Sequence, residues 1–250
     1  MSRETFGEPA KRESAEVETS TLFSSIAHDL RTPLTSIKAA STTLLRHESE
    51  LDQAVRMELL ETIRDSADSL DRLIGNALQI SRGRAGVLEP KRVSAAIDEV
   101  ASRTLEQLRH RLRDHRVLLV IPEDLPEVPV DVTSIDQVLT NLLENAARFS
   151  PPGTEIAISM LPRDGHVLIR VEDHGPGIPA HERERVFEPF VKLAPGGGAG
   201  LGLTAAKAIA QAHGGRITIE DARGGGTAVV MELPRSRHLV VPELSEETLL

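Results

Sequence analysis

A histidine followed directly by an aspartate is the first place in this chain where side chains could do covalent chemistry. The pair belongs to the run HDLRTP at residues 28–33. An exposed imidazole has a pKa near ~6.5, so its neutral form is a nucleophile at physiological pH. Asp29 can keep one ring nitrogen protonated, which leaves the lone pair of the other nitrogen for attack. Most of the nine histidines in such a chain would be solvated bystanders, so the hypothesis for His28 depends on its neighbours.

Two asparagines define a second candidate site, in the run NLLENAARFS at residues 141–150. Asn141 and Asn145 are four residues apart, which places them on one face of a helix. Amide oxygens at that spacing can reach a magnesium ion, which prefers hard oxygen ligands and keeps several waters. Arg148 and Phe149 add a cationic group and an aromatic ring. A single asparagine in a helix would more often cap it or face solvent.

Glycine-rich turns supply a third group of candidates. The run DHGPGI at residues 173–178 follows a predicted strand, and a buried carboxylate there can accept a hydrogen bond from an adenine amino group. The run GAGLGL at residues 198–203 opens a predicted helix, whose free amides favour phosphate. Between them, residues 191–197 are predicted to form a mobile lid. The contexts of a Walker or Rossmann site are missing.

Apolar periodicity predicts two antiparallel helices that carry the first motif. Phe23, Leu30, Ile37 and Leu44 recur every seven residues, and a second helical run covers about residues 51–80. Such a hairpin cannot bury its apolar seam alone. The expected solution is a homodimer in which two hairpins form a four-helix bundle.

A glycine-rich break at residues 83–90 separates this hairpin from a mixed segment. Helices are predicted at about 95–113, 134–148 and after Gly200. Strands are predicted at 117–121, 156–160, 167–171, 216–220 and 227–233, which together make a two-layer α/β sandwich. The predicted division is therefore a linker or lead-in helix at 1–19, a helical domain at 20–83, an α/β domain at 84–234 and a tail at 235–250.

Composition narrows the functional classes. The chain has 250 residues and lacks the run of roughly 20 apolar residues that spans a bilayer, so a cytoplasmic location is expected, with a membrane-anchored longer parent left open. The absence of cysteine excludes disulfides and thiol nucleophiles. A net charge of -9 and only 2% aromatic residues argue against nucleic-acid binding. The expected partner is a protein.

These four motifs and the run FEPF at residues 187–190, in their order along the chain, resemble the boxes of bacterial two-component sensor histidine kinases. Residues 28–33 look like the phosphoacceptor box, and residues 141–150, 173–178, 187–190 and 198–203 look like the N, G1, F and G2 boxes. The α/β domain thereby resembles the Bergerat ATP-binding fold. The resemblance implies that His28 accepts the γ-phosphoryl group, that Asp29 assists as base, and that Thr32 helps orient a water for dephosphorylation of the partner.

The same resemblance implies roles in ATP and Mg²⁺ binding. Asn145 would be the metal ligand with support from Asn141, Arg148 would contact phosphate, Phe149 would lie near the adenine, and Asp173 would recognise it. The other implied ATP-binding residues are Gly175, Gly177, Ile178, Phe190, Gly198, Gly200, Leu201, Gly202 and Leu203.

The predicted function is autophosphorylation of His28 by ATP, followed by transfer to an aspartate of a response-regulator receiver domain, with phosphatase action on that regulator as a further role. A hydrolytic ATPase of the same fold is disfavoured, because those relatives carry a glutamate base where this chain has Asn141. A non-catalytic scaffold or phosphatase-only regulator is the remaining alternative. The signal, an upstream sensor domain or membrane receptor portion, and phosphorylation within or between chains stay open.

Overall fold

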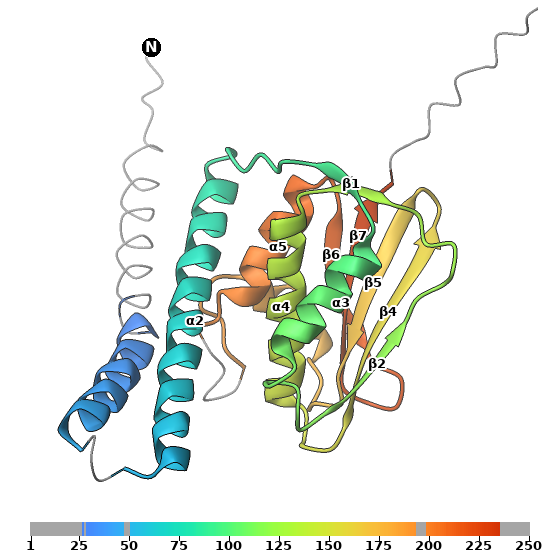
Figure 1. The fold of residues 1–250 in the computed structure, drawn as a ribbon. Coiled ribbons are helices and arrows are strands. Elements are labelled where there is room, and N and C mark those ends of the chain that lie inside the picture. The colour runs from blue at the N-terminus through green and yellow to red at the C-terminus, as the bar shows by residue number, and fades with distance from the viewer. Residues whose placement is uncertain (1–26, 28, 48–50, 194–198, 236–250) are drawn as a thin grey trace, which may run out of the picture.

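The computed structural model describes residues 27, 29–47, 51–193 and 199–235. Residues 29–46 form the first helix, and α2 (Gln53–Arg84) runs back beside it, so the predicted hairpin is confirmed (Figure 1). The Asp52 side chain accepts a hydrogen bond from the amide of Val55 and caps α2. Phe23 of the predicted seam lies outside the described residues. Among the described helices, none combines the length and apolar character that a bilayer crossing requires.

A five-stranded sheet forms the second half of the molecule, with strand order β2-β4-β5-β7-β6. Its strands are β2 (Arg116–Val120), β4 (Glu155–Arg163), β5 (His166–Glu172), β6 (Arg216–Asp221) and β7 (Thr227–Pro234). β2 pairs with β4 in parallel and the other neighbours pair antiparallel. Alternation along the strands turns Ile156, Ile158 and Met160 inward, where each is fully buried.

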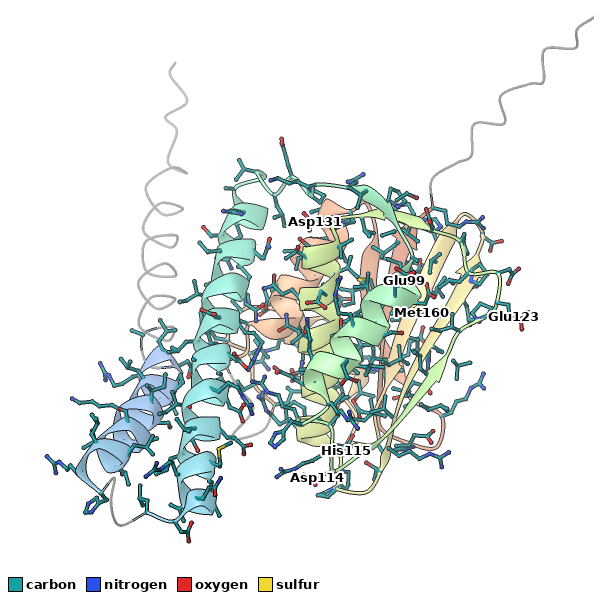
Figure 2. All side chains as sticks on the ribbon, viewed as in Figure 1. Glu99, Asp114, His115, Glu123, Asp131 and Met160 are labelled. Carbon is teal, nitrogen blue, oxygen red and sulfur yellow. The ribbon has the colours of Figure 1, made fainter. Side chains whose placement is uncertain are left out.

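Three helices cover one face of this sheet, so the predicted two-layer α/β sandwich is confirmed. They are α3 (Ile97–Leu108), α4 (Val132–Phe149) and α5 (Gly202–Ala212). Figure 1 shows them between the sheet and α2. The core lies between the layers, where Ile135 and Leu139 of α4 are fully buried and join the same cluster as Met160 of β4 (Figure 2).

Three details differ from the sequence-based expectation. α2 continues to Arg84, past the predicted end near residue 80. α3 ends at Leu108 because residues 109–114 form turns, where a helix to 113 was predicted. β1 (Val93–Ala95) and β3 (Val128–Val130) form a small antiparallel pair that was not predicted. Strands of three residues are too short to show an alternating pattern.

A buried histidine ties the start of α4 to the end of α5. The backbone amide of Asp131 donates to Nε2 of His213 at 3.0 Å, and Nδ1 of the same ring lies 2.8 Å from the carbonyl oxygen of Ile209. Nε2 therefore accepts and Nδ1 carries the proton. The Asp131 side chain caps α4 by accepting from Ser134 (Figure 2). Burial lowers the pKa of His213.

Candidate functional site

A cavity of about 630 Å³ opens between α4, the start of α5, residues 173–193 and α2. That volume lies in the range of small-molecule sites. The cavity brings together most of the residues that the motifs predicted for nucleotide binding. Those that line it are Asn141, Asn145, Arg148, Phe149, Asp173, Gly177, Ile178, Gly200, Leu201, Gly202 and Leu203.

Three of the residues predicted for nucleotide binding do not line the cavity or cannot be placed in it. Gly175 and Phe190 are not among its lining residues and instead shape the backbone around it. The predictions for Gly198 and His28 fall outside the described residues, as does most of the predicted lid.

Asp173 stands at one end of the cavity with its carboxylate held by the backbone. Its Oδ1 accepts from the amide of Gly175 at 2.8 Å and from the amide of Thr227 at 3.1 Å. No described residue donates to Oδ2, so this oxygen can accept from a ligand amino group. Burial is the largest influence on this carboxyl and raises the pKa of Asp173.

Glycines let the chain pass close to Asp173. Gly226 has a φ of +105°, and a Cβ there would lie 2.0 Å from the carbonyl oxygen of Asp173. A Cβ on Gly175 would lie 3.0 Å from the Asp173 carboxylate and from the carbonyl oxygen of Phe149. Any larger residue at Gly226 would push the start of β7, at Thr227, away from the Asp173 carboxylate.

The two ends of the predicted lid are pinned to each other. The amide of Phe190 donates to the carbonyl oxygen of Gly200 at 2.9 Å. Both residues have left-handed backbone, with φ of +66° and +67°. A Cβ on Gly200 would lie 2.9 Å from the backbone of Phe190, so this close crossing requires glycine. Phe190 and Leu201 then pack against Ile80 of α2.

Asn141 is buried at the junction of three helices. Its amide nitrogen donates to Oδ1 of Asn76 on α2 at 3.0 Å and to the carbonyl oxygen of Gly202 at 3.3 Å. Its Oδ1 accepts from Nδ2 of Asn76 at 3.3 Å. Gln137 donates to the same Asn76 oxygen at 2.8 Å. Asn141 thus links α2, α4 and α5, while Asn145 lies in the cavity wall.

The phosphoacceptor motif meets the cavity at Lys192. The Lys192 ammonium, which lies in the cavity wall, is 3.5 Å from the carboxylate of Asp29. Asp29 is largely buried, with 15% of its side chain exposed. Thr32 follows one helical turn later and is exposed. The residue adjacent to His28 therefore touches the nucleotide side of the molecule.

One wall of the cavity was not predicted from the sequence, because it comes from α2 of the helical hairpin. Ser69, Arg72, Leu73 and Asn76 of α2 line the cavity opposite the predicted motifs. A polar stripe on an amphipathic helix usually faces solvent, so charge alone would not have identified it. The feature of the sequence that could have indicated this wall is Asn76, a polar residue inside the otherwise apolar run Leu73-Ile74-Gly75-Asn76-Ala77.

An ionic cluster joins the same helix to α4. Glu144 pairs with Arg72 of α2, at 3.0 Å, and with Arg111. Arg111 also lies 3.4 Å from the carboxylate of Asp68 on α2. Burial lowers the pKa of Arg72, although neighbouring Glu144 opposes that effect. The helical hairpin and the sandwich are therefore in direct polar contact at the cavity.

This arrangement can hold a nucleotide, with Asp29 of the HDLRTP motif in contact with the cavity wall at Lys192. A buried carboxylate, Asp173, marks one end, and the helix N-terminus at Gly202, Arg148 and Lys192 offer positive charge elsewhere. Among the described residues, no group of three or more His, Asp or Glu side chains could hold a metal ion by itself. A metal at this site would need oxygen ligands from the bound molecule as well as from asparagine.

Comparison with known families gives two matches. Residues 18–86 match the family described as the His Kinase A (phospho-acceptor) domain. Residues 130–237 match the family described as histidine kinase-, DNA gyrase B-, and HSP90-like ATPase. The two matches contain the two sets of motifs that the structure brings into contact.

Individual relatives agree with these matches. The chain is 32% identical over 244 residues to a sensor protein KdpD of Clostridium acetobutylicum, covering 94% of this chain and 27% of that protein. A solved mycobacterial sensor histidine kinase MprB is 36% identical with a TM-score of 0.50, covering 58% of this chain and 96% of that one. The chain spans about a quarter to a little over half of the curated relatives it matches.

A further solved structure shares the fold over more of the chain. It is the histidine kinase ThkA in complex with the response regulator protein TrrA, at 24% identity and a TM-score of 0.62. The similarity covers 92% of this chain and 65% of that one. At this identity it supports the arrangement of helices and sheet.

Proposed function

This chain belongs to the two-component sensor histidine kinases, and from that premise we propose that it transfers the γ-phosphoryl group of ATP to its own His28. The observation that carries the proposal is the contact between Asp29 and Lys192, 3.5 Å apart, which brings the acceptor motif to the edge of the nucleotide cavity. Proximity of donor and acceptor is the main demand of phosphoryl transfer.

The proposed step balances without a further reactant. A ring nitrogen of His28 attacks the γ-phosphorus, a P–N bond forms, and the bond to the bridging oxygen of ADP breaks. Asp29 acts as the base: it accepts a hydrogen bond from the N–H of the other ring nitrogen and takes up that proton as the P–N bond forms. Lys192 and Arg148 stabilise the negative charge on the transferring group and on the departing ADP.

ATP fits the cavity in one direction. The adenine amino group donates to Oδ2 of Asp173, with Ile178 and Phe149 in the wall around the ring. The phosphates then extend toward the start of α5, where Gly200, Leu201 and Gly202 bring the backbone close to them.

The donor set around the phosphates also fits Mg²⁺. Asn145 would hold it through its amide oxygen, and Asn141 would support Asn145 by fixing the neighbouring helices. When bound, the ion would neutralise phosphate charge. One protein oxygen, phosphate oxygens and waters are a usual coordination shell for this ion, which agrees with the absence of a carboxylate cluster among the described residues.

The whole protein is proposed to act as a homodimer. Large apolar side chains remain exposed on the hairpin, including Leu34 (57%), Leu45 (82%) and Leu78 (50%). A helical hairpin with such a face is stabilised by pairing with a second copy into a four-helix bundle. We assign residues 20–83 to this dimerisation and phosphoacceptor domain and residues 84–234 to the ATP-binding domain.

Phosphohistidine is proposed to pass its phosphoryl group to an aspartate of a response-regulator receiver domain. The relative ThkA is solved with the response regulator TrrA, which supports that class of partner. Thr32 is exposed one turn after Asp29. Its proposed role is to orient a water when the regulator is dephosphorylated.

Labelling with γ-labelled ATP and Mg²⁺ tests the proposal. We expect the chain to retain label that is acid-labile and base-stable, because the P–N bond of phosphohistidine has those properties. His28→Gln should retain none, and His47→Gln, on the same helical hairpin, should label normally. Nucleotide binding without any label would instead support the scaffold or phosphatase-only alternative.

A further inference from the structure

The face of α2 that meets the ATP-binding domain is a stripe with four-residue spacing. It consists of Asp68, Arg72, Asn76 and Ile80, and each member contacts a different part of the other domain. Residues spaced by four lie on one side of a helix. This side differs from the exposed apolar side that is proposed to pair with a second copy.

Arg72 is the member of the stripe that is both charged and part of the cavity wall. Its side chain is only 23% exposed, and its Nε lies 3.0 Å from Oε2 of Glu144. Burial of this guanidinium is costly unless anionic groups surround it. Its electrostatic neighbours include Arg148, the predicted phosphate contact on the next turn of α4.

Positive charge exceeds negative charge at this end of the cavity. The electrostatic neighbours of Arg72 are two further guanidinium groups, of Arg111 and Arg148, and two carboxylates, of Glu144 and Asp68. Glu144 is shared between Arg72 and Arg111, and Arg111 also contacts Asp68, so Arg72 is the cation without a carboxylate to itself. The cluster is therefore complementary to an additional anion.

We propose that Arg72, supplied by the hairpin helix, binds the terminal phosphate of the nucleotide and makes the site prefer ATP to ADP. This inference rests on the proposed function, which puts adenine at Asp173 and directs the phosphates toward the start of α5, where Leu201 packs against Ile80 of α2. The phosphate furthest from adenine is then the one that reaches the α2 wall.

In this proposal, Glu144 is the partner of Arg72 until the terminal phosphate replaces it. A guanidinium forms paired hydrogen bonds with a phosphate as readily as with a carboxylate. When the terminal phosphate arrives, Arg72 turns from Glu144 to that phosphate. ADP lacks that phosphate and leaves the Arg72–Glu144 pair intact.

Two substitutions in one ion pair separate this role from simple domain packing. Binding of ADP and of a non-hydrolysable ATP analogue to the full chain is measured by calorimetry with Mg²⁺. Arg72→Ala should weaken the analogue about tenfold, the typical loss of a hydrogen bond to a charged group, and leave ADP within about twofold. Glu144→Gln frees Arg72 and should tighten the analogue.

Arg111→Ala is the matched control, because Arg111 contacts the same Glu144 but does not line the cavity. It should leave the affinities for both nucleotides within about twofold. If Arg72→Ala and Glu144→Gln both weaken the analogue, the pair only holds the domains together and the inference is wrong. Equal effects of Arg72→Ala on both nucleotides, or none, would also overturn it.

A wild-type chain that binds neither nucleotide would contradict the proposed function, and this inference with it. A wild type that binds both and prefers the analogue, with Arg72→Ala removing that preference, supports the inference. Thermal unfolding of each variant shows whether its fold is retained. Arg72→Lys keeps the charge without the paired donors and should recover part of the analogue affinity.

Discussion

At the scale of single residues, Asp173 shows how the backbone prepares a side chain for a ligand. Amides of Gly175 and Thr227 hold Oδ1, which fixes the direction of Oδ2. Burial raises the pKa of this carboxyl, while the two amides oppose that rise. These amides favour the carboxylate form in a partly apolar cavity, and in that form both oxygens act purely as hydrogen-bond acceptors.

His213 is a residue whose protonation should limit stability at low pH. Burial lowers its pKa in the fold, with Arg92 adding to that effect and Asp131 opposing it. The unfolded chain therefore binds the proton first. The contribution of His213 is complete above about pH 6.5 and is lost as pH falls toward the lower folded pKa, by at most about 1.4 kcal/mol per pH unit.

Urea unfolding between about pH 5 and pH 7.5 measures this loss. His213→Gln retains an oxygen that can accept from the amide of Asp131 but cannot be protonated there. We expect the unfolding free energy of the variant to fall less steeply with acid than that of the wild type. Identical slopes for both proteins would show that other groups govern the acid sensitivity.

At the scale of elements, the crossing of Phe190 and Gly200 sets the position of the lid. Gly200→Ala should cost at least about 1–2 kcal/mol of unfolding free energy because of its φ of +67°. A further loss is expected because the new Cβ would lie 2.9 Å from the backbone of Phe190. Nucleotide affinity should fall as well, since Gly200 lines the cavity.

Gly153→Ala is the matched control for this substitution. Gly153 also has a positive φ, of +85°, but a Cβ there has nothing within 4 Å. The Gly153→Ala variant should lose only the part of the unfolding free energy that comes from backbone strain, and it should keep its nucleotide affinity. If urea unfolding and calorimetry give the same values for both variants, the crossing has no special role in holding the lid.

The elements that were predicted correctly have signals along a continuous stretch of sequence. Alternation at Ile156, Ile158 and Met160 predicted β4, and the motif around Asn145 predicted the cavity-facing side of α4. Residues that line the cavity were therefore predicted where a single motif contains both the residue and the turn or helix that carries it. β1 and β3 were missed because each has only three residues.

The contacts of α2 could not be predicted from the same kind of signal. Arg72 and Asn76 belong to the site only because a second domain packs on the hairpin, and helical periodicity describes one helix at a time. Gly75 and Gly83 make that packing close, since Cβ atoms there would lie 3.3 Å from Gln137 and 3.1 Å from Ala208. A glycine inside a helix indicates such an approach without naming the partner.

At the scale of the whole molecule, the contact between Lys192 and Asp29 joins the proposed nucleotide cavity and the proposed acceptor motif of the same chain. We therefore expect phosphorylation within a chain. In heterodimers of a His28→Gln chain with an Asn145→Ala chain, one chain lacks the acceptor and the other lacks the metal ligand. Transfer within chains leaves such heterodimers unlabelled by γ-labelled ATP.

Differently tagged chains allow the heterodimers to be isolated before labelling. Heterodimers of wild type with His28→Gln provide the control and should carry label on the wild-type chain. Label on the Asn145→Ala chain of the mixed dimer would mean that the phosphoryl group crosses between chains, contrary to this expectation.

The reciprocal amide pair of Asn76 and Asn141 limits how this kinase can be recombined with others. The two residues are 65 positions apart, and both are buried. A chimera that joins residues 84–234 to a foreign hairpin leaves Asn141 with unpaired polar atoms, at a cost of about 1–3 kcal/mol, unless the new helix carries asparagine at the matching turn. Successful exchange of modules, in the laboratory or by gene fusion, would have to transplant both asparagines together.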